Sequence, residues 1–188
     1  MVLCLNCQFY FVQTVNQWHA LKNPPILWLL MKPLVILLAV FGLSSLAFWL
    51  ITGSWNLLFC GNLAMCVMLC FTALGHFLFP KGMAMMIPPF IPFRTALVYI
   101  TGVAEIAFGF LLLFPASRWY AGYALLIFFV LILPANIYAA LHHIDLEKGT
   151  TTGPGPSYLW FRIPLQVFFI GWVYFFATPL VASLTCIL

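Results

Sequence analysis

Five long apolar stretches constrain this chain more than any other feature of its sequence. A helix needs roughly 20 apolar residues to cross the hydrocarbon core of a bilayer, since each residue adds only about 1.5 Å. Between the stretches stand Gly, Pro and charged residues, which mark the breaks between helices. The sequence therefore predicts five membrane-spanning helices, at about residues 33–52, 56–79, 95–114, 119–141 and 162–183.

The composition excludes a water-soluble fold. Only 5% of the 188 residues are charged and 65% are hydrophobic, whereas an average soluble domain has about 25% charged residues. The fold class we expect is all-α, a polytopic transmembrane helix bundle. The seven Lys and Arg residues are scattered singly along the chain. They form no basic cluster that could bind a phosphate backbone, so nucleic acid is excluded and the lipid bilayer is the expected partner.

The positions of the basic residues predict the orientation, because Lys and Arg concentrate in cytoplasmic connections. Six lie on one side of the predicted spans and one on the other. The N-terminus is therefore expected in the cytoplasm and the C-terminus outside. The six are Lys22, Lys32, Lys81, Arg94, Lys148 and Arg162, and the single residue on the opposite side is Arg118.

Residues 1–30 allow two interpretations. Met31-Lys32 is a plausible true start, which would make the preceding segment an overextended gene start. Alternatively, the segment is an interfacial tail, with Trp18 and His19 at headgroup level and Pro24-Pro25 as a joint. The CxxC formed by Cys4 and Cys7 lacks a second pair or a βαβ context, so we expect no chemistry from it.

Proline residues predict three local features. The proline-rich segment 80–92 cannot form a regular span and is expected to lie along the cytoplasmic interface as a short helix or capping loop. Pro134 lies inside the fourth span, where it should bend the helix and free the Val130 carbonyl. Pro164 is expected in the first turn of the fifth span, where proline is tolerated.

Glu105 is the outstanding polar residue within the spans. It lies roughly 16 Å along the helix axis from Arg94, and an acidic residue at the centre of a membrane helix costs about 2.5–3.5 kcal/mol. Its side chain should therefore face the bundle interior. Thr101, Gly102 and Gly109 lie on the same helix face. The small residues there would let a neighbouring helix or a ligand approach closely.

Further polar residues lie near the cytoplasmic ends of the other spans. Together with Glu105 they predict a polar vestibule on the cytoplasmic side, with the carboxyl group at its floor. Structural interpretations stay open: a hydrogen bond that fixes packing for Glu105, capping for His76, interhelical bonding for Asn136, and snorkelling to headgroups for Arg162. The candidate vestibule residues are His76, Thr101, Glu105, Asn136, Arg162 and Gln166.

No catalytic motif is present, so the catalytic residues are unknown. The sequence has no Gly-rich phosphate loop, no HExxH and no Ser nucleophile elbow. Three of the six cysteines, Cys60, Cys66 and Cys70, lie in an apolar helix, where free Cys behaves as a small hydrophobe. Cys66 and His76 stand about 15 Å apart along one helix, so we expect no metal site within that helix.

Five short motifs stand in order along the chain: Gly75-His76-Phe77, Met86-Ile87-Pro88-Pro89, Thr101-Gly102-Val103-Ala104-Glu105, Pro134-Ala135-Asn136-Ile137-Tyr138 and Arg162-Ile163-Pro164-Leu165-Gln166. Together they resemble the DoxX-like family of small prokaryotic membrane proteins. The resemblance implies a four-helix transmembrane domain over residues 56–183, with 31–55 as an additional transmembrane helix and 1–30 as a tail. It also implies the plasma (inner) membrane of a prokaryote.

Three functions remain open at this point. The resemblance implies an accessory subunit of a membrane redox system, quinone- or thiol-linked, with redox subunits as partners. His76 and Glu105 would then hydrogen-bond quinone oxygens or relay protons. The alternatives are a non-catalytic binder or carrier of a small amphipathic molecule, and an assembly factor whose polar residues specify packing. The sequence shows no electron carrier of its own, so we do not expect an autonomous oxidoreductase.

Overall fold

The structure is a computed structural model that describes residues 24–153 and 155–178 of the chain. The predicted tail features, among them Cys4, Cys7, Trp18 and His19, lie outside the described residues.

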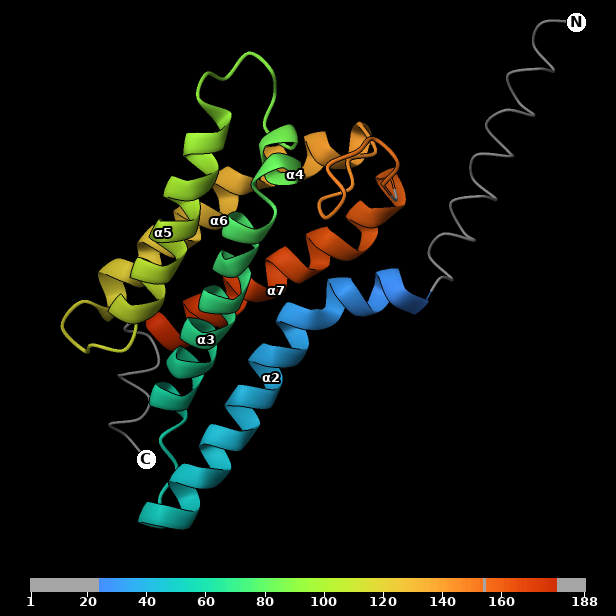
Figure 1. Cartoon of the computed structure of the whole chain (residues 1–188). Helices are drawn as coiled ribbons and strands as arrows, with labels where there is room; N and C mark the ends of the chain where they lie inside the picture. The colour runs from blue at the N-terminus through green and yellow to red at the C-terminus, as the bar shows by residue number, and fades with distance from the viewer. Residues whose placement is uncertain (1–23, 154, 179–188) are drawn as a thin grey trace, which may run out of the picture.

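The described residues form an all-helical bundle, as predicted, and contain no β-strand. Five of the helices are long and apolar enough to cross a membrane, which confirms the five predicted spans. Figure 1 shows them side by side with their connections at the two ends. The elements are α2 (Pro24–Thr52), α3 (Leu57–Leu78), α4 (Pro80–Met85), α5 (Arg94–Leu111), α6 (Arg118–Leu141), η1 (Gly155–Tyr158) and α7 (Leu159–Ala177).

Helix α3 is the centre of the bundle. Half of its most apolar 18-residue stretch is buried, against 11% of the corresponding stretch of α2. It packs against α2, α5 and α7, and α6 completes the bundle by packing on α7. The core is apolar and closely filled, and its largest fully buried apolar side chains are Leu37, Met65, Met68, Leu69, Leu112, Leu125 and Val173.

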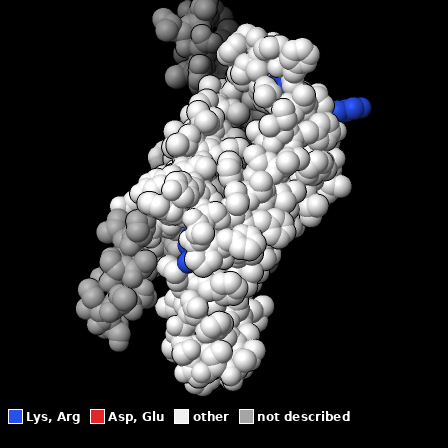
Figure 2. Space-filling model, turned by 90° about the vertical axis from the view of Figure 1, so that its left-hand side faces the viewer, with Lys and Arg blue, Asp and Glu red and all other residues white. Residues whose placement is uncertain are grey.

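The outer surface of the bundle also carries many large apolar side chains. Large side chains such as Ile51, Leu131 and Trp160 are 83%, 71% and 87% exposed. Figure 2 shows one side of the molecule almost without charged side chains. An exposed apolar surface of this extent is unstable in water and matches a hydrocarbon environment.

Two polar links tie α3 to α7. The Asn62 side chain donates to the Phe176 carbonyl over 2.8 Å, and the Trp172 indole N–H donates to the Gly61 carbonyl over 3.1 Å. The Phe176 carbonyl lies in the last turn of α7, where helix carbonyls lack intrahelical partners. Asn62 therefore caps the end of the neighbouring helix as well as joining the two.

The proline predictions have mixed outcomes. Segment 80–92 does begin with a short helix, α4, in which Pro80 occupies the first turn. Pro134 lies inside α6 as predicted. The prediction for Pro164 is wrong: α7 begins at Leu159, so Pro164 is its sixth residue and lies beyond the first turn. The reason is that η1 leads directly into α7, which adds a turn of helix before the predicted start.

The first spanning helix also begins earlier than expected. Helix α2 starts at Pro24 and runs through Pro33, whereas the apolar pattern placed its start at residue 33. Proline is tolerated in the first turn of a helix because no N–H is needed there. Pro24 and Pro25 are thus the first two residues of α2, and the candidate membrane span within this helix begins at Met31.

Candidate functional site

Helices α3 and α5 approach each other closely because α5 has glycine at the contact points. A Cβ atom on Gly102 would lie 2.8 Å from the Cβ of His76, closer than real side chains come. A Cβ on Gly109 would lie 3.4 Å from the Cα of Cys66. The sequence predicted that either a neighbouring helix or a ligand approaches these small residues closely. The structure shows a neighbouring helix, α3, at both of them.

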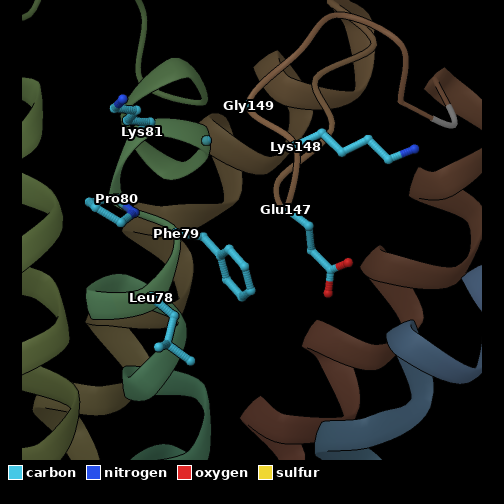
Figure 3. Close-up of a pocket in the computed structure, with 8 residues that line it drawn as sticks. Leu78, Phe79, Pro80, Lys81, Glu147, Lys148 and Gly149 are labelled. Carbon is cyan, nitrogen blue, oxygen red and sulfur yellow. The ribbon is translucent and has the colours of Figure 1, made fainter.

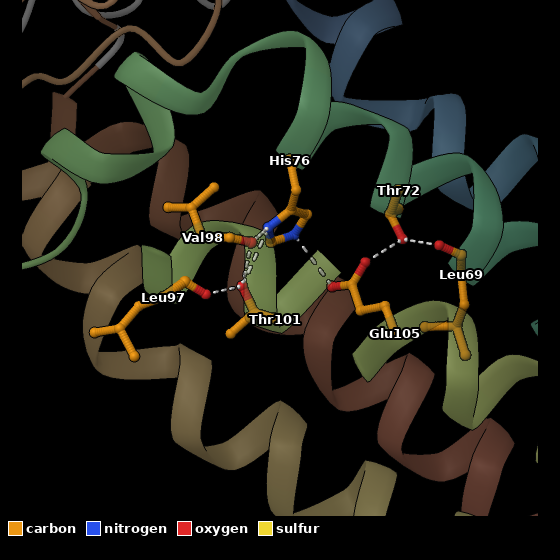
Figure 4. Close-up of polar contacts among 7 residues, drawn as sticks. All are labelled: Leu69, Thr72, His76, Leu97, Val98, Thr101 and Glu105. Atoms are coloured by element: carbon orange, nitrogen blue, oxygen red, sulfur yellow. Dashed lines mark hydrogen bonds and ion pairs between the residues drawn. The ribbon is translucent and has the colours of Figure 1, made fainter. Parts of the chain in front are cut away.

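This close packing brings together two titratable side chains. The Nε2 atom of His76 lies 3.6 Å from Oε1 of Glu105, and the two side chains are 13% and 8% exposed (Figure 4). Glu105 is buried among the helices, as its predicted interior orientation requires. A carboxyl group in this environment needs a polar partner, and His76 is positioned to be that partner.

Contacts on the far side of the imidazole ring place a proton on its Nδ1 atom. The Nδ1 atom of His76 lies 2.8 Å from the Val98 carbonyl oxygen. A carbonyl oxygen only accepts hydrogen bonds, so Nδ1 carries a proton and donates it. Nε2 then either carries a lone pair that faces a protonated carboxyl group, or carries a hydrogen that faces a carboxylate. In both arrangements the pair holds one proton, and the 3.6 Å separation is an ion-pair distance, longer than a hydrogen bond.

Two threonine hydroxyls complete the cluster. Thr101 Oγ1 lies 3.2 Å from His76 Nδ1 and 2.9 Å from the Leu97 and Val98 carbonyl oxygens. Thr72 Oγ1 lies 3.1 Å from Glu105 Oε2 and can donate to it. Thr72 was not among the residues predicted for the site, although it precedes His76 by four residues and must share its helix face. We call Thr72, His76, Thr101 and Glu105 the His–Glu cluster.

The remaining predicted vestibule residues lie on α6 and α7. Gln166 Nε2 donates over 2.8 Å to the carbonyl oxygen of Phe129, one residue before the carbonyl expected to be freed by Pro134. Asn136 is 3% exposed, and its Nδ2 has no hydrogen-bond partner within the described part of the chain. Arg162 is half-buried near the start of α7. Of the six predicted residues, the structure gathers His76, Thr101 and Glu105 into one cluster.

A cavity of about 290 Å³ lies at the end of the bundle, beyond the His–Glu cluster. It is lined by residues 78–82, where α3 passes into α4, and by residues 147–149 of the α6–α7 connection (Figure 3). None of the six predicted vestibule residues lines it. The polar cluster and the cavity are therefore separate features.

The cysteines within α3 are free thiols. Cys60 and Cys66 are 1% and 4% exposed and pack as small apolar residues. In the two described ranges, no three His, Cys, Asp or Glu side chains come together as metal ligands would.

The chain is similar to a known protein family. Residues 65–177 match the family model described as "Domain of unknown function (DUF8561)". The matched segment begins within α3 and ends with α7, so it contains the whole His–Glu cluster. No curated protein and no solved structure matches the chain.

Proposed function

The chain belongs to the DUF8561 family, a domain of unknown function, and we propose that it is an accessory subunit of a membrane redox system whose His–Glu cluster holds and passes a proton. One observation supports this most directly: the imidazole of His76 and the carboxyl group of Glu105 face each other at 3.6 Å inside the bundle. An acidic and a basic group of this kind exchange a proton with little rearrangement.

The geometry favours proton transfer over binding of a ligand oxygen at the same atoms. His76 uses Nδ1 on the Val98 carbonyl, and its Nε2 faces Glu105. Glu105 uses its second oxygen on Thr72. The polar atoms of the pair are thus directed at each other, and the described cavity lies elsewhere. A proton can enter such a pair along hydrogen-bonded groups. A quinone ring would have to push α3 and α5 apart to reach the same atoms.

The redox part of the proposal rests on the resemblance to the DoxX-like family. Quinone reduction consumes protons together with electrons, so a subunit that delivers protons can serve a quinone-linked partner. The electrons would come from that partner subunit, and a quinone is the cofactor this arrangement would use. A thiol-linked partner would need protons in the same way.

The cluster lies near one end of the bundle, which suits proton uptake from that side. His76 is two residues before the end of α3, and Thr101 is in the second turn of α5. By the distribution of basic residues, this end faces the cytoplasm. We accordingly propose a multi-pass protein of a prokaryotic inner membrane, with a cytoplasmic N-terminus and an external C-terminus.

An assembly role is the second candidate, and one observation favours it. The side chains of Asn62, Gln166 and Trp172 donate to backbone carbonyls of neighbouring helices. Such bonds specify helix packing without any chemistry. In that case the His–Glu cluster would also serve only to join α3 to α5.

The test is to purify the tagged chain from native membranes in mild detergent, identify the proteins and quinones that accompany it, and measure quinone reduction. Glu105→Gln and His76→Gln should lower the rate by about a hundredfold or more, the usual contribution of acid–base catalysis. His142→Gln, on an exposed histidine, is the matched control. Full activity in both cluster variants would reject the proton role, and a chain without redox partners would favour assembly.

A further inference from the structure

The hydroxyl group of Thr72 lies between two oxygen atoms. Its Oγ1 atom is 3.0 Å from the Leu69 carbonyl oxygen and 3.1 Å from Oε2 of Glu105 (Figure 4). A hydroxyl group has one proton to donate, and its oxygen can also accept hydrogen bonds. Thr72 can therefore donate to either of these two oxygen atoms. Leu69 belongs to the same helix, α3, so its carbonyl stays within reach whichever form Glu105 takes.

The other titratable atoms of the His–Glu cluster are already in use. His76 Nδ1 carries a proton that it donates to the Val98 carbonyl over 2.8 Å. The one proton that the pair holds lies on His76 Nε2 or on Glu105 Oε1, which face each other at 3.6 Å. A second proton in that space would point one hydrogen at another. Oε2 of Glu105 is thus the atom that remains for an additional proton.

A proton on Oε2 needs an acceptor, because the Glu105 side chain is only 8% exposed. Thr72 Oγ1 is within hydrogen-bond distance of Oε2 and becomes that acceptor when its own proton turns to the Leu69 carbonyl. A carbonyl oxygen has two lone pairs, so it can accept this proton besides a backbone N–H of the helix. Both forms of Oε2, bare and protonated, then have a complete hydrogen bond.

Thr101, beside His76, offers no such choice. Its Oγ1 atom lies 2.9 Å from the carbonyl oxygens of both Leu97 and Val98. Its proton therefore goes to a backbone carbonyl, and its oxygen is left to accept from His76 Nδ1 at 3.2 Å. The Nδ1 side of the cluster is fixed, whereas the Oε2 side can change.

The nearest charge that acts on Glu105 is that of His76. Helix α5 packs on α3, α4 and α6. Within the described ranges, the hydrogen bond and the ion pair of the Glu105 carboxyl group are both made with α3. The basic residue of α6, Arg118, donates to the Leu112 carbonyl at the far end of α5, and Lys81 of α4 lines the cavity beyond the cluster.

We propose that Thr72 is the positioning residue that makes Oε2 of Glu105 the atom that gains and loses the transferred proton. The Thr72 hydroxyl donates to Oε2 when this oxygen is bare and accepts from it when it is protonated. Uptake forms one O–H bond at Oε2 and release breaks the same bond, with no other covalent change. The proposal rests on the proton role proposed above, since it names the atom that holds the transferred proton.

Infrared spectroscopy of the purified full chain in detergent tests the proposal. It follows the C=O stretch of protonated Glu105, assigned by its loss in Glu105→Gln, down to the lowest pH at which the chain keeps its helical content. Hydrogen bonding of a carboxyl group lowers the frequency of this stretch. Thr72→Val, which removes the hydroxyl group, should therefore raise the frequency, and Thr72→Ser should keep it at the wild-type value. Thr95→Val, on an exposed threonine of α5, is the matched control and should leave it unchanged.

The same frequency in the wild-type chain and in Thr72→Val would overturn the proposal. So would the absence of any carboxyl band that Glu105→Gln removes. If Thr72→Val does not fold, Thr72→Ala also removes the hydroxyl group and should raise the frequency in the same way.

The spectrum is recorded on the chain alone, so its outcome is separate from that of the quinone assay. A raised frequency in Thr72→Val together with full quinone reduction in the Glu105 and His76 variants would reject the redox function and support the hydrogen bond assigned here. An unchanged frequency together with lost quinone reduction in Glu105→Gln would reject the role of Thr72 and leave the redox function in place.

Discussion

The Nε2 atom of His76 on α3 and the Oε1 atom of Glu105 on α5 lie 3.6 Å apart inside an otherwise apolar bundle. This relationship depends on Gly102, because any side chain there would displace the His76 backbone. It also depends on the Val98 carbonyl, which accepts from His76 Nδ1 at 2.8 Å and turns Nε2 toward Glu105. The pair is therefore built by the contact between the two helices, and the following predictions test that contact and its surroundings.

The His76–Glu105 contact should appear as an energetic coupling. In a double-mutant cycle of His76→Gln and Glu105→Gln, the effects on the free energy of unfolding should be non-additive by about 1 kcal/mol, as for contacting residues generally. Unfolding in mixed detergent micelles measures it. A parallel cycle of Glu105→Gln with the exposed His142→Gln should be additive. Additivity in the first cycle would mean that the two groups do not interact.

Gly102→Ala should destabilise the protein, since the added methyl group would lie 2.8 Å from the Cβ of His76. Overpacking of this kind costs about 1–3 kcal/mol. Gly171 on α7 is the matched control, because a Cβ there meets no atom within 4 Å. Gly171→Ala should be neutral or stabilising by up to about 1 kcal/mol. The measurement is the free energy of unfolding, and equal effects of the two changes would contradict the observed α3–α5 packing.

Gln166→Met should weaken the contact between α6 and α7. Methionine has a similar length but cannot donate to the Phe129 carbonyl, which Gln166 Nε2 reaches at 2.8 Å. The loss in the free energy of unfolding should be about 0.6 kcal/mol, the average for hydrogen bonds between membrane helices. Val167→Met, on a neighbouring side chain that is 62% exposed, should have no comparable effect. A similar loss in both variants would point to a general effect of methionine in α7.

The orientation can be tested by labelling exposed positions in the two opposite connections. In a background with the six native cysteines replaced by alanine, Ala116→Cys should react with an impermeant thiol reagent applied to intact cells. Thr151→Cys should react only after permeabilisation. Both positions are exposed in the structure, so access to the reagent depends on the side of the membrane. The reverse pattern would invert the topology derived from the basic residues.

The sequence predicted the number and approximate position of the spanning helices, because the bilayer sets a minimum apolar length that any single segment meets or fails by itself. It also predicted that Glu105 faces inward, since the cost of exposing a carboxyl group to hydrocarbon depends on that residue alone. Pro164 was misplaced because the start of α7 depends on how η1 joins it, and helix boundaries follow from such local geometry more than from hydropathy.

Only the tertiary structure decided which helices meet and through which atoms. Both the outer surface and the interior of the bundle carry large apolar side chains, so hydropathy cannot tell which face of α3 contacts α5. The pairing of His76 with Glu105 and the part played by Thr72 depend on how α3 packs on α5, and the donation from Gln166 to Phe129 depends on how α7 packs on α6. The cavity beside Glu147 also depends on packing, since its walls come from segments far apart in the chain. The length and polarity of each segment are local properties of the sequence, whereas these contacts depend on packing between segments.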